Sequence, residues 1–132
     1  MKDLVINGEA KTPTINFNFQ NGELLISGRS IPENSVEFYE PVIAWLDEYK
    51  SSNGAGLKID IKLEYFNTSS SKCILDLFKK LEELKESTKD IAVSWYFEED
   101  DEDMEEAGQD FQAIINIPMG SCLRNIGGGF GS

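Results

Sequence analysis

Apolar and polar positions follow regular spacings along much of this chain, and these spacings predict both strands and helices. Two short strand-like runs, residues 14–19 and 23–27, flank Asn21 and Gly22. This pair suits a tight type I′ turn, so we expect a β-hairpin. The run 4–6 before it is either an edge strand or an N-terminal arm, and the pattern leaves that choice open.

A first helix is expected after the hairpin. Apolar residues recur every three or four positions over residues 36–49, as in an amphipathic helix. Asn34 or Ser35 is placed to cap it, and Glu37 can complete a capping box with Asn34. Pro41 removes one backbone donor within the pattern. We therefore expect one kinked helix that ends before the Ser-Ser-Asn-Gly run.

The next segment predicts a strand that leads directly into a second helix. Residues 57–66 alternate strictly, with apolar side chains and Tyr65 on one face and charged side chains on the other. Five small polar residues, Asn67 to Ser71, follow at once. An apolar stripe then marks a helix that reaches about Glu86. The polar run therefore forms the junction between strand and helix.

The C-terminal third predicts two further strands and a short helix. Residues 91–97 are nearly continuously apolar, which is typical of a central strand covered on both faces. A short helix is expected over residues 104–111, followed by a last strand at 113–117 that Pro118 ends.

Strands that alternate with helices favour an α/β fold. We expect a single domain over residues 1–119, with a mixed sheet of about five strands and right-handed crossover helices. The Gly-rich segment 120–132 is expected to be a flexible tail.

Composition narrows the range of partners. The chain has 132 residues, of which 40% are hydrophobic, as expected for one folded core. Twelve basic and 24 acidic residues give a formal net charge of −12, which repels phosphate backbones and anionic lipids, so we expect no nucleic-acid partner. No apolar run approaches the roughly 18 residues of a membrane span, and no signal-like segment is seen. We expect no membrane insertion and a cytoplasmic location.

Residue types also exclude several kinds of chemistry. The chain contains no histidine, which excludes Ser-His-Asp, Cys-His and zinc-hydrolase mechanisms. Cys73 and Cys122 form no ligand cluster, and we interpret both as structural. The run from Glu98 to Glu106 holds eight acids in nine residues but lacks the spacing of a calcium loop, which favours a solvated loop or helix face over a calcium site or a contact with a basic partner. We expect no cofactor, no metal and no catalytic residue.

The polar junction Asn67 to Ser71 is the main candidate for chemistry. It lies at the amino end of a helix, where free N–H groups and the helix dipole favour an anion. Two compatible interpretations exist: Asn67, Thr68 or Ser69 caps the helix, or one hydroxyl is an exposed phosphoacceptor. A third interpretation is a module that binds a small anionic ligand at Asn67–Ser70. An enzyme that uses Asp60 or Glu64 as a base is a more distant alternative.

Several motifs together resemble the SiaC family of bacterial regulatory phosphoproteins. They are Pro-Glu-Asn-Ser at 32–35, Trp-Leu-Asp-Glu-Tyr at 45–49, Tyr-Phe-Asn-Thr-Ser-Ser at 65–70 and Val-Ser-Trp-Tyr at 93–96. The resemblance covers about residues 4–118, nearly the whole predicted domain.

The resemblance implies a partner switch in a protein that performs no reaction itself. By this resemblance, a serine/threonine kinase of the histidine-kinase-like ATPase type is expected to phosphorylate the threonine of the Asn-Thr-Ser-Ser motif, here Thr68, and a PP2C-type phosphatase is expected to remove the phosphate. The unmodified form is then expected to bind and activate a diguanylate cyclase, which raises cyclic di-GMP and promotes aggregation or biofilm growth.

The residues around Thr68 are the expected contacts of the phosphate or of a partner. Asn67, Ser69 and Ser70 neighbour it in sequence, and Lys72, one helical turn on, is a candidate partner for the phosphate.

Phe66 has two possible positions. By alternation it points opposite to Tyr65, so it either joins an exposed contact surface beside Thr68 or lies under a crossover helix.

A more distant similarity is to anti-sigma factor antagonists of the STAS type, which implies a STAS-like fold and an alternative role as such an antagonist. Asn67 stands where those proteins have Asp, and Ser70 stands where many have Gly. These departures weaken a link to sigma factors but leave the architecture unchanged.

Overall fold

The part of the chain that the structure describes, residues 1–87, 89–117 and 119–124, folds around one mixed sheet of six strands. The structure is a computed structural model. Each strand lies beside its neighbours in sequence. The antiparallel strands are β1 (Leu4–Ile6), β2 (Thr14–Asn18) and β3 (Glu23–Ser30). Parallel to β3 follow β4 (Gly56–Phe66), β5 (Asp90–Glu98) and β6 (Met119–Arg124).

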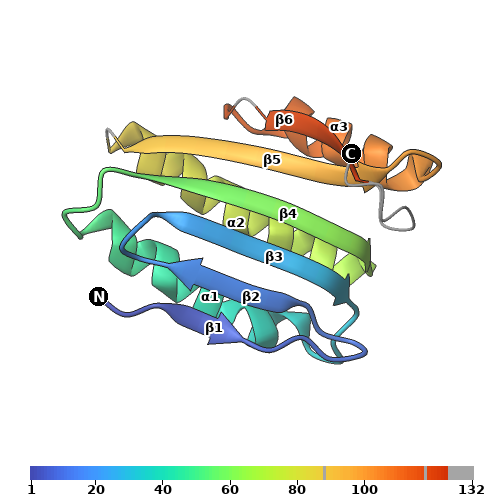
Figure 1. Ribbon diagram of the computed structural model, residues 1–132, viewed down its shortest axis with the longest axis horizontal. Coiled ribbons are helices and arrows are strands. Elements are labelled where there is room, and N and C mark those ends of the chain that lie inside the picture. The colour runs from blue at the N-terminus through green and yellow to red at the C-terminus, as the bar shows by residue number, and fades with distance from the viewer. Residues whose placement is uncertain (88, 118, 125–132) are drawn as a thin grey trace.

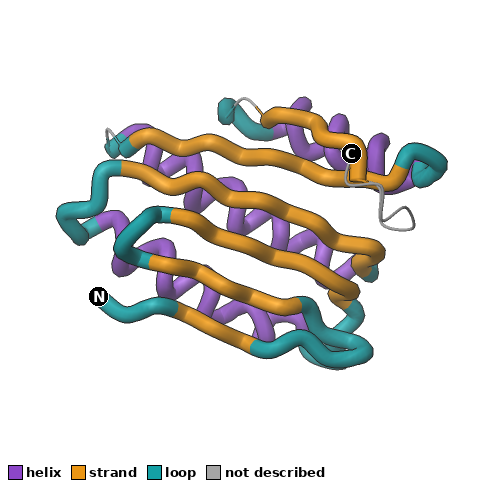
Figure 2. Tube along the Cα trace, in the orientation of Figure 1, coloured by secondary structure: helices purple, strands orange, loops and turns teal. Residues whose placement is uncertain are grey.

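Each step between parallel strands passes through a helix. These connections are α1 (Ser35–Lys50), α2 (Thr68–Glu86) and α3 (Glu102–Ile114). Figures 1 and 2 show these helices behind the sheet, so they cover one face and leave the other open. Successive crossovers that step the same way along a sheet, with the same hand, place their helices on the same face. The expected α/β class is confirmed, with six strands in the described residues rather than about five.

The one-sided helix layer produces alternating burial along the strands. In β4, the side chains of Leu57, Ile59 and Ile61 are at most 4% exposed. On the open face, Lys58 between Leu57 and Ile59 is exposed, and Lys62 after Ile61 is half-buried. The predicted strand with one wet face is therefore confirmed.

The prediction that β5 is covered on both faces is wrong. Val93 and Trp95 are buried, whereas Ala92 is exposed and Tyr96 is half-buried. The run looks continuously apolar because the positions on its open face are held by Ala92 and Tyr96 rather than by charged residues. On that face Lys62 Nζ lies 4.7 Å from the centre of the Tyr96 ring.

The last strand is not at residues 113–117, where the apolar run predicted it. α3 continues to Ile114, and β6 follows only later. Ile115 and Ile117 are buried, so this run is apolar because it covers the core and not because it pairs with β5. Pro118, expected to end the strand, lies outside the described residues.

The predicted boundary between domain and tail also moves. Residues 120–124, expected to begin the flexible tail, belong to β6, which pairs with β5 from Val93↔Met119 to Glu98↔Arg124. The rest of the predicted tail, residues 125–132, lies outside the described residues.

The predicted hairpin is confirmed, but its turn is longer than expected. β2 and β3 pair as far as Asn18↔Glu23, which leaves residues 19–22 in the turn instead of two residues. Gly22 has a φ of 67°, and a Cβ there would lie 2.5 Å from the carbonyl oxygen of Gly56. Both the backbone angle and the available space therefore require glycine.

The first helix forms as one element. The Asn34 side chain caps it by accepting a hydrogen bond from the N–H of Glu37 at 3.0 Å. The helix continues through Pro41, which is exposed, to Lys50. The preceding run 4–6 is an edge strand, β1, paired with β2.

Two aromatic clusters occupy opposite ends of the core. Near β1, Trp45 stacks on Tyr49 with ring centres 5.4 Å apart, and its indole N–H donates to the Lys2 carbonyl at 2.8 Å. Near β6, Trp95 packs against Phe111 at 5.6 Å, and its N–H donates to the Met104 carbonyl at 2.9 Å. Each indole is therefore buried with its polar atom satisfied.

Candidate functional site

A β-bulge at the end of β4 sets the orientation of the residues before the polar junction. Gly28 of β3 pairs with Leu63, and Arg29 pairs with Tyr65, so Glu64 is an extra residue in β4. The alternation predicted as far as Tyr65 therefore reverses at this point. Tyr65 is 53% exposed, instead of following the buried face of the strand.

Because of the bulge, Phe66 turns toward the core. It is half-buried, and its ring centre lies 6.2 Å from that of Trp95 and 6.3 Å from that of Phe111 on α3. Of the two predicted positions, the one under a crossover helix is confirmed. The exposed aromatic side chain just before the junction is Tyr65, which the sequence analysis did not single out.

Asn67 caps α2. Its Oδ1 accepts from the N–H of Ser70 at 2.9 Å and from the Ser69 hydroxyl at 3.2 Å. The backbone N–H of Asn67 donates to the carbonyl oxygen of Ser30 at 3.0 Å, which ties the start of α2 to the end of β3. Of the three candidate caps, the structure thus selects Asn67.

A buried chain of hydroxyl groups holds this junction together. Ser70, which is fully buried, donates its hydroxyl to the Ser30 carbonyl at 3.0 Å. The Ser30 hydroxyl in turn donates to Ser70 Oγ at 2.8 Å. Tyr39 of α1 completes the chain, with its hydroxyl 2.7 Å from Ser30 Oγ. Since Ser30 gives its proton to Ser70, Tyr39 is the donor in that last contact.

The same chain extends to the start of α1. Ser35 Oγ lies 2.8 Å from Ser69 Oγ and 3.3 Å from Ser70 Oγ. The end of β3 and the beginnings of α1 and α2 are thus joined by neutral side chains.

Burial shapes the protonation of this network. It raises the pKa of the Tyr39 phenol to about 12, although the hydrogen bond with Ser30 lowers it. The phenol therefore stays neutral at physiological pH and remains a donor. Burial, reinforced by Asp76, also raises the pKa of the Cys73 thiol, which lies one turn further along α2.

Sequence reasoning missed Ser30 and Tyr39, and it treated Ser35 only as a capping candidate and a motif residue. A signal was present, because Ser30 ends a strand and Ser35 begins a helix, positions that meet at one edge of a parallel sheet. What the sequence does not show is that Ser30 and Ser70, forty residues apart, touch.

Thr68 differs from the hydroxyls around it. It is the first residue of α2 and is exposed, and its side chain makes no hydrogen bond within the part of the chain that the structure describes. Lys72, also exposed, lies one turn along the same helix.

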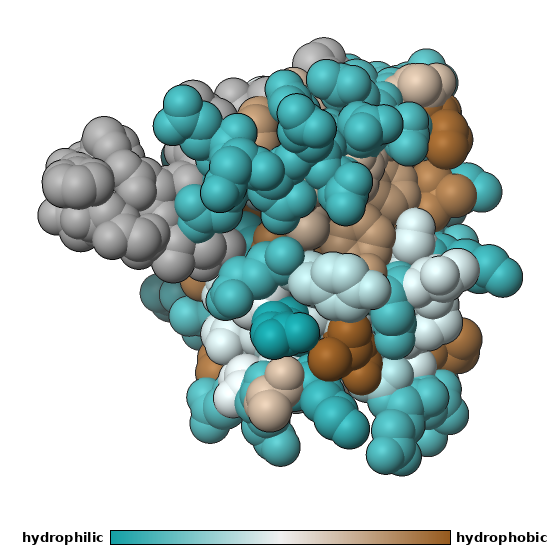
Figure 3. Space-filling view, turned by 90° about the vertical axis from the view of Figure 1, so that its right-hand side faces the viewer, coloured by the Kyte–Doolittle hydropathy of each residue, from teal (hydrophilic) through white to brown (hydrophobic). Residues whose placement is uncertain are grey.

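The junction follows the carboxyl end of β4, and the connection between β5 and α3 leaves the sheet at the same edge. Figure 3 views the molecule from the side at which β3, β4 and β5 end, and hydrophilic residues gather in its upper part, over the β5–α3 connection of Figure 1. This is the location of the acidic run 98–106, within which Asp101 caps α3 by accepting from the Met104 N–H at 3.0 Å. The predicted solvated loop and helix face agrees with this placement.

Few groups here suit a bound ligand. The cap occupies the N–H of Ser70, and the N–H of Ser71 bonds to the Asn67 carbonyl, which leaves the N–H groups of Thr68 and Ser69 for an anion. Over the described residues, no cluster of three or more Cys, Asp or Glu side chains is placed to hold a metal. Within the same residues, no helix is long and apolar enough to cross a membrane.

The fold and this junction define a single-domain α/β protein with an exposed threonine at a helix start on the carboxyl edge of its sheet. A family model described as the SiaC family regulatory phosphoprotein matches residues 6–122. The chain therefore belongs to the SiaC family, which confirms the resemblance drawn from the Pro32–Ser35 and Asn67–Ser70 motifs.

Similar proteins are found in Pseudomonas aeruginosa. An uncharacterised protein of strain UCBPP-PA14 is 33% identical over 119 residues, which are 90% of this chain and 94% of that protein. The crystal structure of apo-SiaC matches with a TM-score of 0.85 and 32% identity, covering 92% of this chain and 99% of that chain. The crystal structure of the diguanylate cyclase SiaD in complex with its activator SiaC matches with a TM-score of 0.87 and 31% identity, covering 92% and 100%.

Proposed function

We propose that this chain is a cytoplasmic, non-enzymatic phosphoswitch. In its unmodified form it binds and activates a diguanylate cyclase, and phosphorylation of Thr68 releases that partner. A histidine-kinase-like serine/threonine kinase adds the phosphate, and a PP2C-type phosphatase removes it. Membership of the SiaC family and the similarity to an activator seen in complex with its cyclase support this proposal.

The observation that carries the assignment to Thr68 is the unequal freedom of the neighbouring hydroxyls. Ser70 is buried and Ser69 is bonded to Ser35, so neither is free to enter a kinase active site without breaking the junction. Ser71 is half-buried one residue further into the helix. Thr68 alone among these four neighbours is both exposed and without a hydrogen bond in the described structure.

The fold tolerates a phosphate at this position. Phosphorylation adds about −1.5 to −2 charges at the positive end of the α2 dipole, where an anion is favoured. Lys72 can approach the phosphate from one turn away, although an exposed contact of this kind contributes at most about 1 kcal/mol. The switch therefore acts on binding rather than on folding.

A partner packed over Thr68 responds strongly to the same modification. Burying a dianion without a matched cation costs several kcal/mol, or about a hundredfold or more in affinity.

Phosphorylation and binding can be measured together. Intact-mass analysis after incubation with the cognate kinase is expected to show one added phosphate on the wild type and on Ser71→Ala, but none on Thr68→Ala. Purified phosphorylated protein is expected to bind the cyclase at least about a hundredfold more weakly than unmodified protein. Equal affinity of the two forms contradicts the proposal, and a phosphate that persists on Thr68→Ala moves the site to another hydroxyl.

A further inference from the structure

A groove lies between α1 and α2 on the side of the helices that faces away from the sheet, and it begins next to the junction. Along α2, Ser69, Cys73, Asp76 and Lys80 recur at spacings of four, three and four, so they form one stripe that faces α1. Ser69 contacts Ser35 across the helix pair at 2.8 Å. The exposed Thr68 therefore stands at the amino end of this stripe.

The groove has an apolar lining. It encloses about 340 Å³ between the two helices. Val36, Ile43 and Ala44 line it from α1, and Cys73 lines it from α2. Val36 is 71% exposed, and Ala44 is also exposed, although both belong to a helix whose other face is packed on the sheet. A helix-pair groove of this shape accepts apolar side chains of another helix.

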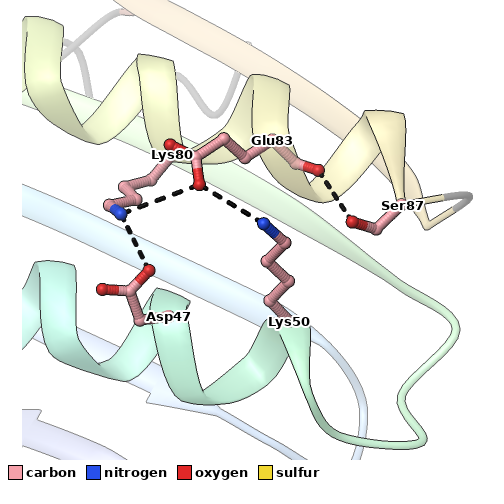
Figure 4. Close-up of polar contacts among 5 residues, drawn as sticks. All are labelled: Asp47, Lys50, Lys80, Glu83 and Ser87. Atoms are coloured by element: carbon pink, nitrogen blue, oxygen red, sulfur yellow. Dashed lines mark hydrogen bonds and ion pairs between the residues drawn. The ribbon is translucent and has the colours of Figure 1, made fainter.

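Acidic side chains border this apolar lining. Glu40 and Asp76 flank it, and neither forms an ion pair within the described part of the chain. At the far end, Asp47 is paired with Lys80 at 2.8 Å. Figure 4 shows how Lys80 and Lys50 both reach Glu83, so ion pairs close this end of the groove.

We propose that this groove binds an amphipathic helix of the regulated partner, a helix that presents apolar residues on one face and Lys or Arg residues beside them. This inference rests on the proposed function and names the surface and the partner chemistry that it needs. Charge selects this occupant, because the groove adds unpaired acids to a chain of net charge −12. A second copy of this chain brings the same negative charge and is disfavoured.

The groove also explains why Thr68 controls binding. A helix lying between α1 and α2 ends against the amino terminus of α2, where the hydroxyl of Thr68 is exposed. Glu40 and Asp76 stay solvated beside the bound helix, whereas a phosphate on Thr68 occupies space that the helix needs. The two acids therefore attract the partner helix at one point of the contact, and the phosphate excludes it at another.

A matched pair of tryptophan substitutions tests the groove. Ala44→Trp fills it, and Ala113→Trp places the same side chain on an exposed position of α3. With the full chain and the full-length diguanylate cyclase of the same organism, we expect Ala44→Trp to weaken binding at least about tenfold and Ala113→Trp to leave it within about twofold. Circular dichroism and melting temperature serve to confirm that both variants fold. Val36→Ala removes part of the apolar lining at a second, exposed position without a change in charge, and is expected to weaken binding by a smaller factor.

A pair of charge reversals tests the partner chemistry. The double variant Glu40→Lys, Asp76→Lys is expected to slow association about tenfold at low salt, with a smaller effect at high salt. Glu86→Lys, an exposed reversal at the far end of α2, is expected to change association less than about twofold. An equal effect of the two reversals overturns the proposed basic partner helix.

A second probe keeps the inference testable if the cyclase does not bind. A synthetic Leu/Lys amphipathic peptide of about 18 residues, long enough to be helical, is compared with a scrambled peptide of the same composition. If no cyclase binds even to the unmodified wild type, the proposed function fails. The peptide experiment alone then tests whether the groove binds an amphipathic helix. Binding to wild type that Ala44→Trp abolishes supports the groove, and equal binding of both peptides overturns it. If the cyclase binds and phosphorylation releases it, but Ala44→Trp and Val36→Ala do not weaken binding, the proposed groove is wrong and the proposed phosphoswitch stands.

Discussion

The two ends of the α1–α2 pair are held by different chemistry. At the amino ends, Ser35 and Ser69 meet through neutral hydroxyls 2.8 Å apart. At the carboxyl ends, partly exposed ion pairs join the helices, and Lys80 Nζ lies 2.8 Å from Asp47 Oδ1. The hydroxyl contacts connect to the fully buried Ser70, whereas water and salt screen the ion pairs. We therefore expect the contacts at the amino ends to fix how α1 and α2 pack together, and the contacts at the carboxyl ends to contribute little to stability.

The largest expected effect comes from ionising the buried end of the network. The pKa of Tyr39 is about 12 in the folded state against 10 for an ordinary tyrosine, so above pH 10 the unfolded chain loses a proton that the folded chain keeps. Stability therefore falls as pH rises from 10 to about 12, by about 2 to 3 kcal/mol. Urea unfolding at pH 8, 10 and 11.5 measures this loss, and Tyr39→Phe is expected to reduce it. An unchanged pH dependence in that variant assigns the loss to other groups.

A slightly smaller effect is expected from removing the central hydroxyl. Ser70→Val leaves the Ser30 hydroxyl without its acceptor and the Ser30 carbonyl without one of its donors, which costs about 2 kcal/mol of stability. Ser71→Val makes the same chemical change in the same helical turn at a half-buried position, so it corrects for helix propensity. Equal urea midpoints for the two variants speak against an energetic role for the network.

The cap of α2 is expected to contribute less. Asn67→Ala removes the acceptor of the Ser70 N–H, at a typical cost of about 1 kcal/mol. Asn67→Asp retains an acceptor and is expected to restore most of the loss. Thermal unfolding of the three proteins measures this order, and a variant with Asp no more stable than one with Ala refutes the capping role.

The smallest effect is expected at the carboxyl ends of the helices. Lys80→Ala breaks the contacts with Asp47 and Glu83, yet a partly exposed pair that water still screens contributes at most about 1 kcal/mol. The hydrogen bond with Asp47 raises the pKa of Lys80, but both side chains remain in contact with water, which limits what this contributes to stability. The loss is expected to shrink further in 1 M salt, where the Debye length is about 3 Å. If Lys80→Ala lowers the free energy of unfolding more than Ser70→Val does, the amino ends of the helices are not the more important contact, and the comparison of the two ends is wrong.

Much of the fold follows from local patterns. Strict alternation predicts β4, the three-and-four spacing predicts α1 and α2, and small polar residues predict the capped start of α2. These features depend on neighbours within one or two turns, so the sequence shows them directly. The choice of Thr68 as the phosphoacceptor rests on the resemblance of the Asn67–Ser70 motif to the SiaC family and stays a prediction.

Features that depend on pairing between distant segments were not predictable in the same way. The bulge at Glu64 arises from the register between β3 and β4. The alternation that holds as far as Leu63 therefore does not predict that Tyr65 faces solvent. The open face of β5 depends on all three helices lying on one side, which apolar composition does not reveal.

The positions of the two indoles provide optical probes of the two ends of the core. Trp45 belongs to the cluster near β1 and Trp95 to the cluster near β6, and these are the only tryptophans in the sequence. Replacing either with Phe leaves a protein whose intrinsic fluorescence reports on one half alone. Coincident melting of both versions will then establish that the antiparallel and parallel halves of the sheet unfold as one cooperative unit.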